Sequence, residues 1–131
     1  TMDIRYYEVP DERTRVRRLD LDGNDIVWFV NSTMGKIGRL DPATGEITQW
    51  DSPSGPRSHP YSMAVIDDVI WYNESGMRPD ALVRFNPQTE SFQSWAIPSG
   101  VGIIRNTWVT EAGNLLIHQS SSNQVGLVKI N

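Results

Sequence analysis

Arginine and tyrosine side chains occur at matching places in three repeated segments of this chain. They are Arg17, Arg18, Tyr61, Arg105 and, beside that arginine, Asn106. Arginine presents a planar fork of N–H donors that suits a carboxylate or a phosphate group. The residues therefore predict a binding site for a small polar or anionic ligand. In the alternative, these arginines pair with Asp20, Asp22 or Glu111 and only brace the fold.

Two further residues could take part in acid–base or metal chemistry. His59 lies in an expected loop, and an unperturbed imidazole has a pKa near ~6.5, which suits a general base. The alternative for His59 is a solvated loop residue. Glu74 could bind a metal ion, although Mg²⁺ sites usually combine carboxylates with waters or substrate phosphates. The residues by themselves predict no cofactor, and no glycine-rich phosphate loop or His-Glu-x-x-His motif occurs.

These residues belong to a unit that is repeated along the chain. Segment 25–32 resembles 68–75 and, more weakly, 114–121, while segment 36–42 resembles 81–87 and 124–130. The copies of the first segment lie 43 and 46 residues apart. Such a period is typical of the four-stranded blades of a β-propeller.

Each unit contains four short stretches with strand character, separated by turn residues. The first strand of each unit is expected to be innermost, at residues 16–22, 61–66 and 102–110. In the turn Asp41–Gly45, proline presets φ and glycine accepts a positive φ, which suits a tight hairpin. No stretch keeps a period of about 3.6 residues, so no helix of note is expected.

The predicted fold class is all-β, a β-propeller of four-stranded blades with three blades per chain. The 131 residues form one domain, a single three-blade unit. Its blades cover residues 16–53, 61–98 and 102–131.

Residues 3–10 carry the pattern of a fourth strand. Like 46–53 and 91–98, they have an apolar residue at the second position, an aromatic at the fifth and a proline at the eighth. No such strand follows the third unit, so the N-terminal strand is expected to complete the last blade, as 102–131 plus 3–10. It could pair with its own third blade or with that of a partner chain.

Three blades are too few to close a ring, because propellers typically have about 4–8. Either identical chains complete the ring or the chain is a piece of a longer propeller. Two chains would give six blades and three chains nine, so a homodimer is favoured and a trimer is possible. An isolated chain would expose the apolar flanks of its first and last blades.

Charge and hydropathy exclude some classes of partner. The chain has 12 Lys and Arg against 16 Asp and Glu, a net charge of −4, which argues against a binder of nucleic-acid backbones. No apolar run approaches the ~18 residues of a membrane span. There is no cysteine, and residues 1–4 carry no signal-peptide pattern. The compartment stays open, with the cytoplasm favoured.

Several motifs resemble the streptogramin (virginiamycin B) lyase-like propeller family. They are the stretch Ile37–Ile47, the strand motifs at 27–29 and 70–72, and the segment Leu82–Pro87. The resemblance covers essentially the whole chain. It implies a seven-bladed propeller of about twice this length, of which this chain matches the three C-terminal blades. It also implies a metal-assisted elimination that uses Mg²⁺, glutamates and a catalytic histidine near the central channel.

The resemblance transfers only part of that catalytic set. The family's Glu-Pro-His element falls on His59-Pro60-Tyr61, and its acidic position in a second strand falls on Glu74. The resemblance thus implies catalytic roles for His59, Tyr61 and Glu74, with Mg²⁺ bound by Glu74. Because the family's acid and base are replaced, we expect a self-associating module that binds a ligand at the ring axis. A metal-assisted lyase and a non-functional fragment of a seven-bladed protein are the alternatives.

Overall fold

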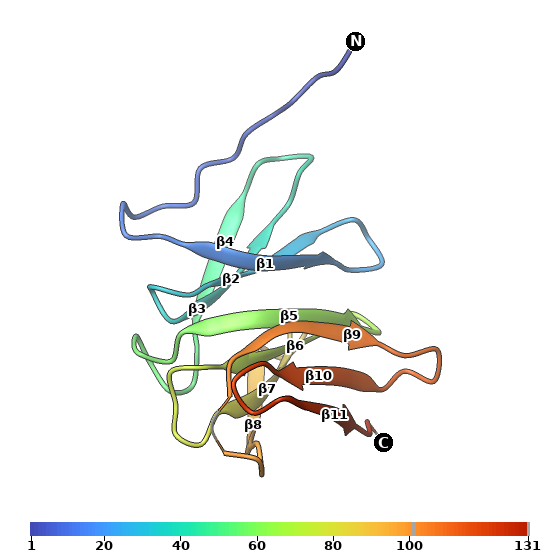
Figure 1. The fold of residues 1–131 in the computed structure, drawn as a ribbon. Coiled ribbons are helices and arrows are strands. Elements are labelled where there is room, and N and C mark those ends of the chain that lie inside the picture. Colours follow the sequence, from blue (N-terminus) through green and yellow to red (C-terminus); the bar gives the residue numbers. More distant parts are fainter. Residues whose placement is uncertain (101, 131) are drawn as a thin grey trace.

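The computed structural model describes residues 1–100 and 102–130 as eleven β-strands in three antiparallel sheets (Figure 1). The first sheet contains β1 (Val16–Leu21), β2 (Val27–Asn31), β3 (Lys36–Leu40) and β4 (Ile47–Asp51), in that order. The second contains β5 (Pro60–Ile66), β6 (Val69–Glu74), β7 (Ala81–Asn86) and β8 (Ser91–Ala96). The third contains β9 (Ile104–Val109), β10 (Leu115–Gln119) and β11 (Gln124–Val128). The described residues contain no helix, and so no helix long and apolar enough to cross a membrane.

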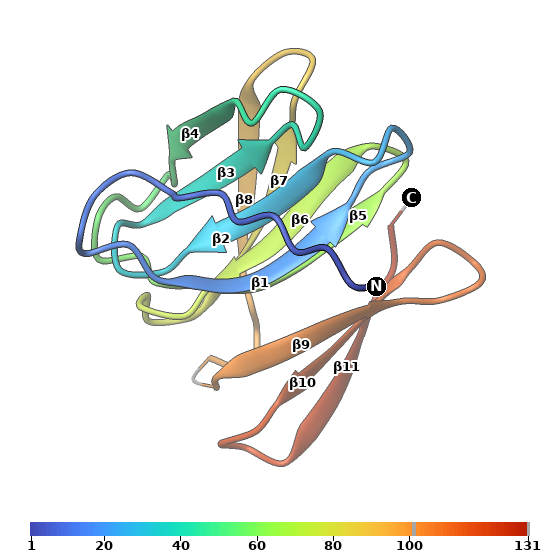
Figure 2. The same ribbon diagram turned by 90° about the horizontal axis from the view of Figure 1, so that it is seen from above.

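The first strands of the three sheets lie side by side, and the other strands extend away from them (Figures 1 and 2). Two contacts link neighbouring first strands. The carboxylate of Asp20 accepts a hydrogen bond from the amide of Val65 at 2.9 Å. The hydroxyls of Ser62 and Thr107 lie 2.7 Å apart. The arrangement confirms the predicted all-β propeller, with β1, β5 and β9 as its innermost strands.

Two apolar cores fill the spaces between the sheets, one between the first and second and one between the second and third. The first core contains Trp28, Val30, Ile37, Met63, Ile70, Tyr72, Val83 and Phe85. The second contains Ala64, Trp71, Leu82, Ile97, Ile104, Leu115 and Ile117. Trp50 stacks on Trp28 at 5.7 Å between ring centroids, and Trp95 stacks on Trp71 at 5.9 Å. The recurring aromatic residues therefore pack at equivalent positions of the repeat.

The strand register corrects the alignment of the third repeat by one residue. Trp28 lies opposite Arg39, and Leu116 lies opposite Leu127 at the equivalent place. The alignment of 114–121 with 25–32 had put Ile117 at that position. Since successive side chains point to opposite faces of a strand, this shift exchanges the buried and outward positions of β10. Ile117 accordingly lies in the second core.

The expected strand at residues 3–10 pairs with no strand of the described residues. These residues form no strand, and the third sheet has three strands rather than four. The hydroxyl of Tyr7 donates to the carbonyl of Pro42 at 2.7 Å, so the segment lies against the first sheet. Figure 1 shows the N-terminal segment and β11 at opposite ends of the molecule, which explains why one chain cannot close its own last blade.

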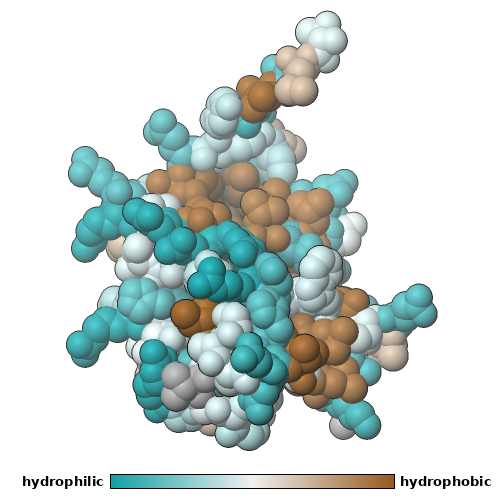
Figure 3. Space-filling model, in the orientation of Figure 1, coloured by the Kyte–Doolittle hydropathy of each residue, from teal (hydrophilic) through white to brown (hydrophobic). Residues whose placement is uncertain are grey.

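Both end sheets turn an apolar face outward. Leu19, on the outward face of the first sheet, is 61% exposed, and Trp108, on the outward face of the third, is 65% exposed. Leu21, Val125 and Leu127 are also exposed. Figure 3 shows one hydrophobic area over the first sheet, beneath the N-terminal segment, and another near the C-terminal end. The prediction that an isolated chain exposes both flanks is therefore met.

Candidate functional site

The predicted ligand-binding residues lie near the starts of the three innermost strands. Arg17 and Arg18 belong to β1, Tyr61 to β5, and Arg105 and Asn106 to β9. In each strand these residues fall within an irregularity of the pairing with the neighbouring second strand. Bulges of this kind redirect side chains and are common beside functional sites. The same local distortion therefore positions all five residues.

These five residues, hereafter the axial cluster, lie on three neighbouring strands, and Arg18 links them through contacts with Tyr61, Asn106 and the backbone of Arg105. The guanidinium carbons of Arg17 and Arg18 lie 5.3 and 5.4 Å from the ring centroid of Tyr61. The Nε group of Arg18 donates to the carbonyl of Arg105 at 3.0 Å and to the Asn106 Oδ1 at 3.1 Å. Cation–π contact and these hydrogen bonds fix the guanidinium groups against the ring.

The arginines of the axial cluster have no acidic partner among the residues that the structure describes. None of Arg17, Arg18 and Arg105 forms an ion pair there. Two of the three acids proposed as partners have other contacts: Asp20 accepts from the Val65 amide, and the Asp22 carboxylate accepts from the Trp28 indole at 2.9 Å. Ring contacts hold Arg17 and Arg18, and none of the three guanidinium groups is paired with a carboxylate of the described residues.

Buried amide side chains support the bulges from behind. The Oδ1 atom of Asn73 accepts from the amide of Ser62 at 2.8 Å and from its hydroxyl at 3.1 Å. In the first sheet, the Oδ1 of Asn31 accepts from the amide of Arg15 at 3.2 Å. Reasoning from the sequence missed both roles. The available signal was a polar residue, Asn73, where the first repeat has Val30.

Glu74 lies apart from the axial cluster, buried between the first and second sheets. Its carboxylate accepts hydrogen bonds from the hydroxyls of Ser52 and Ser54, and from the Ser54 amide at 3.1 Å. These contacts join the end of the first sheet to the second. Within residues 1–100 and 102–130, no group of three or more His, Cys, Asp or Glu side chains could hold a metal ion. The metal-binding role of Glu74 therefore gains no support from its surroundings.

His59 is an exposed loop residue immediately before β5, with a positive φ of 46°. Its carbonyl accepts from the amide of Ser75 at 3.2 Å and from the Ser75 hydroxyl at 2.7 Å. Within the described part of the chain, no hydrogen bond joins His59, Tyr61 and Glu74 to one another.

A groove lies elsewhere in the molecule. It has a volume of about 1010 Å³ and lies between the second and third sheets, along β8 and β11. Trp71, Leu82 and Trp95 line one side, and Ile117, Gly126 and Val128 line the other. No residue of the axial cluster borders it.

Comparison with known proteins identifies the fold. No family model and no curated protein matches the sequence. A streptogramin B lyase structure matches with a TM-score of 0.82 and 21% identity, over 95% of this chain and 40% of that one. A catalytically inactive virginiamycin B lyase from Staphylococcus aureus, crystallised with quinupristin, matches with a TM-score of 0.78 and 21% identity, over 95% of this chain and 44% of that one.

Other solved structures match with lower TM-scores. A protein described as a 6-phosphogluconolactonase from Bacteroides uniformis gives a TM-score of 0.73 and 17% identity, over 93% of this chain and 38% of that one. The computationally designed Ika4 protein gives 0.52 and 11%, over 99% of this chain and 100% of that one. The chain thus spans less than half the length of the lyase structures that it matches. At these identities the likeness shows the fold, and the chain is a propeller unit of the streptogramin B lyase-like architecture.

Proposed function

We propose that two copies of this chain form a six-bladed ring that binds a small anionic ligand at its axis. The axial cluster carries this proposal, because it brings three arginines without a described acidic partner to the starts of the innermost strands. Anionic groups suit such a site, since a guanidinium donates two parallel hydrogen bonds to a carboxylate or a phosphate. The second chain would place an identical cluster across the axis.

The packing inside the chain supports self-association. Trp28, in β2, faces the second sheet, and Tyr72, in β6 of the second sheet, faces the first sheet. At the next contact, Trp71 faces the third sheet and Ile117 faces back. In each contact, the face of one sheet that carries the tryptophan of its second strand packs on the other face of the next sheet.

One face of each kind is left over at the two ends of the chain. The first sheet turns outward the face that holds Phe29 and Leu19, which lie opposite each other in the pairing of β1 with β2. The third sheet turns outward the face with Leu116, opposite both Trp108 and Leu127. The two faces can meet as their counterparts do within the chain, and such head-to-tail contacts form a closed ring when the rotation permits.

Calorimetric titration with inorganic phosphate and with succinate tests the axial site. We expect binding by the assembled protein and a loss of about tenfold or more in Arg17→Ala and in Arg105→Ala, because each removes a positive charge from the axial cluster. Arg84→Ala is the matched control, since Arg84 lies in β7 and donates to Gln93 at 3.3 Å, away from the axis. Absence of binding by the wild-type dimer, or equal binding by all variants, contradicts the proposal.

A metal-assisted lyase has less support, because the described residues include no group of three or more side chains that could hold a metal ion. Its signature would be cleavage of quinupristin in the presence of Mg²⁺, lost in the double variant His59→Ala, Glu74→Gln. A native mass of one chain would instead favour a fragment of a longer propeller.

A further inference from the structure

The open edge of β11 borders the 1010 Å³ groove described above. β3 and β7 each pair with a fourth strand, whereas β11 pairs only with β10 in the described structure. An unpaired edge presents backbone donors and acceptors that can pair with another extended segment. The other wall of the groove, from the second sheet, includes Trp71 and Trp95. The groove therefore has the backbone groups and the apolar wall that a fourth strand requires.

Residues 4–8 match the sequence pattern of the fourth strand in the two complete sheets. In the two complete sheets, the fourth strand pairs in the same register, with Lys36 opposite Asp51 and Ala81 opposite Ala96. Aligning residues 3–10 with 46–53 and 91–98 carries this register to β11. It puts Glu8 opposite Gln124, Tyr7 opposite Val125, Tyr6 opposite Gly126, Arg5 opposite Leu127 and Ile4 opposite Val128.

The N-terminal segment already lies where the fourth strand of a preceding blade would lie. Trp50, the counterpart of Tyr7, reaches the following sheet and packs on Phe85 at 5.2 Å between ring centroids. Tyr7 likewise reaches the following sheet, where its hydroxyl contacts the Pro42 carbonyl. Its ring also lies beside Gly45. One side of the segment is thus packed, while its backbone has no strand partner in the described structure.

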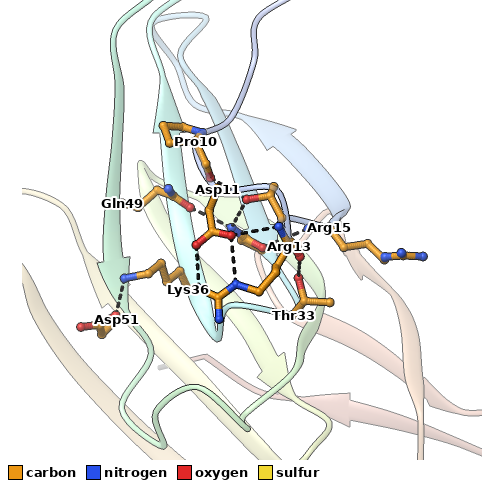
Figure 4. Close-up of polar contacts among 10 residues, drawn as sticks. Pro10, Asp11, Arg13, Arg15, Thr33, Lys36, Gln49 and Asp51 are labelled. Atoms are coloured by element: carbon orange, nitrogen blue, oxygen red, sulfur yellow. Dashed lines mark hydrogen bonds and ion pairs between the residues drawn. The ribbon is translucent and has the colours of Figure 1, made fainter.

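A network of polar contacts fixes the link between this segment and β1 (Figure 4). The Thr14 hydroxyl donates to the Pro10 carbonyl at 2.7 Å. The Arg13 side chain donates to both carboxylate oxygens of Asp11, and the Thr33 hydroxyl donates to the Arg13 carbonyl. The network holds the segment away from the molecule's own β11. The N-terminal segment that can enter the groove is therefore that of a second chain.

We infer that the groove along β11 is an acceptor site for residues 4–8 of a second copy of this chain, which add a fourth antiparallel strand to the third sheet. The inference rests on the proposed self-association and specifies how the two chains join. In a two-chain ring each copy donates one strand and accepts one. Strand addition of this kind gains main-chain hydrogen bonds, and side-chain pockets give the specificity.

Engineered disulfides test the register, and the absence of native cysteine leaves the background clear. The full-length double variants Glu8→Cys, Gln124→Cys and Arg5→Cys, Leu127→Cys each place two thiols directly opposite one another. The two pairs lie three residues apart, so one falls at a closely spaced position of an antiparallel ladder. The controls exchange the partners, as Glu8→Cys, Leu127→Cys and Arg5→Cys, Gln124→Cys, which separates the thiols by roughly 10 Å along the strand.

After mild oxidation, we expect at least one in-register variant to migrate as a covalent dimer without reductant, and both exchanged variants to migrate as monomers. Native mass spectrometry of the wild-type chain separates this inference from the proposed ring. A native dimer in which no in-register variant cross-links keeps the ring and overturns strand exchange. Cross-linking within one chain, or equal cross-linking by the exchanged variants, also overturns it. A monomeric wild-type chain overturns both proposals.

Discussion

At the scale of single residues, buried polar groups reveal local functions that hydropathy does not. Asn73 and Glu74 follow each other at the end of β6 and are both buried. Asn73 supports the bulge that carries Tyr61, whereas Glu74 ties the second sheet to Ser52 and Ser54. Neighbouring side chains of a strand point to opposite faces, so adjacent residues serve different contacts.

Asp80 is a buried acid with an unusual titration. Its Oδ1 atom accepts from the Arg78 guanidinium at 3.3 Å, and its buried Oδ2 has no hydrogen-bond partner among the described residues. Burial raises the pKa of Asp80 from 3.8 to about 6, although the Arg78 charge and a hydrogen bond from the Gly102 backbone act in the opposite direction. The folded protein therefore binds this proton more tightly than the unfolded chain does.

This pKa difference predicts a pH-dependent loss of stability. The contribution of Asp80 to the free energy of unfolding is fully present below the pKa that its carboxyl has in the unfolded chain. It is lost as the pH rises toward about 6. We expect the free energy of unfolding to fall by up to about 3 kcal/mol across this window from Asp80 alone. Urea denaturation between these pH values should show a smaller fall in Asp80→Asn.

Asp11 provides an internal contrast, because hydrogen bonds from Arg13 lower its pKa to about 2. Its contribution therefore has the opposite sign and is lost only as the pH falls below its unfolded value. An Asp80→Asn variant whose stability falls with pH as steeply as the wild type would contradict the assignment.

At the scale of the strands, glycine makes room for the large residue opposite it. A Cβ atom added to Gly38 would lie 2.1 Å from the Phe29 ring, whereas one added to Gly126 would lie 3.1 Å from the Ile117 side chain. The two glycines are equivalent in the repeat, since they lie opposite Phe29 and Ile117. The first sheet therefore depends more strongly on having glycine at this position than the third sheet does.

Gly38→Ala should consequently destabilise the protein by about 1–3 kcal/mol through overpacking against Phe29. The cost of Gly126→Ala should be smaller, because a contact at 3.1 Å is relieved when Ile117 moves by a few tenths of an ångström. Chemical denaturation of the two variants measures the difference. An equal loss in both would show that the close approach of the Phe29 ring does not set the cost.

At the scale of the whole molecule, the chain is an arc of three blades with an apolar face at each end. A charge placed on either face would be buried in the proposed ring, at a cost of several kcal/mol. Leu19→Glu and Leu127→Glu should therefore each raise the dimer dissociation constant by more than about 10-fold, since 1.4 kcal/mol corresponds to that factor.

Sedimentation equilibrium would measure this change. Gln88→Glu is the control, because it adds the same charge at an exposed position in the turn between β7 and β8. Dimers of unchanged affinity in both leucine variants would show that these faces do not form the interface. If only one of the two leucine variants dimerised more weakly, this would contradict an interface in which the two outward faces contact each other.

Much of the fold followed from local patterns in the sequence. The repeat of 43 to 46 residues, the turn at Asp41–Gly45 and the alternating apolar residues predicted the three units and their strands. The weakest repeat was misaligned by one residue in β10, because His118 and Gln119 stand where the first repeat has Val30 and Asn31. Pairing with β11, a non-local contact, was needed to fix that register.

The candidate site was predictable as a set of residues but not as a geometry. The repeat aligned Arg17, Arg18, Tyr61, Arg105 and Asn106, because the same strand position recurs in each blade. The bulges, the contact of two guanidinium groups with one ring and the absence of a described acidic partner depend on how three sheets pack. The separation of Glu74 from the axial cluster likewise depends on which face of β6 its side chain occupies.

The sequence by itself determined the all-β class, the three units and the pattern of residues 3–10, because these depend on local periodicity and turn chemistry. Only the tertiary structure decided where those residues lie. They carry the pattern of a fourth strand, yet they pack against Pro42 and leave the edge of β11 open. The physical reason is that a strand needs a partner in space, and three blades do not bring the two ends of this chain together.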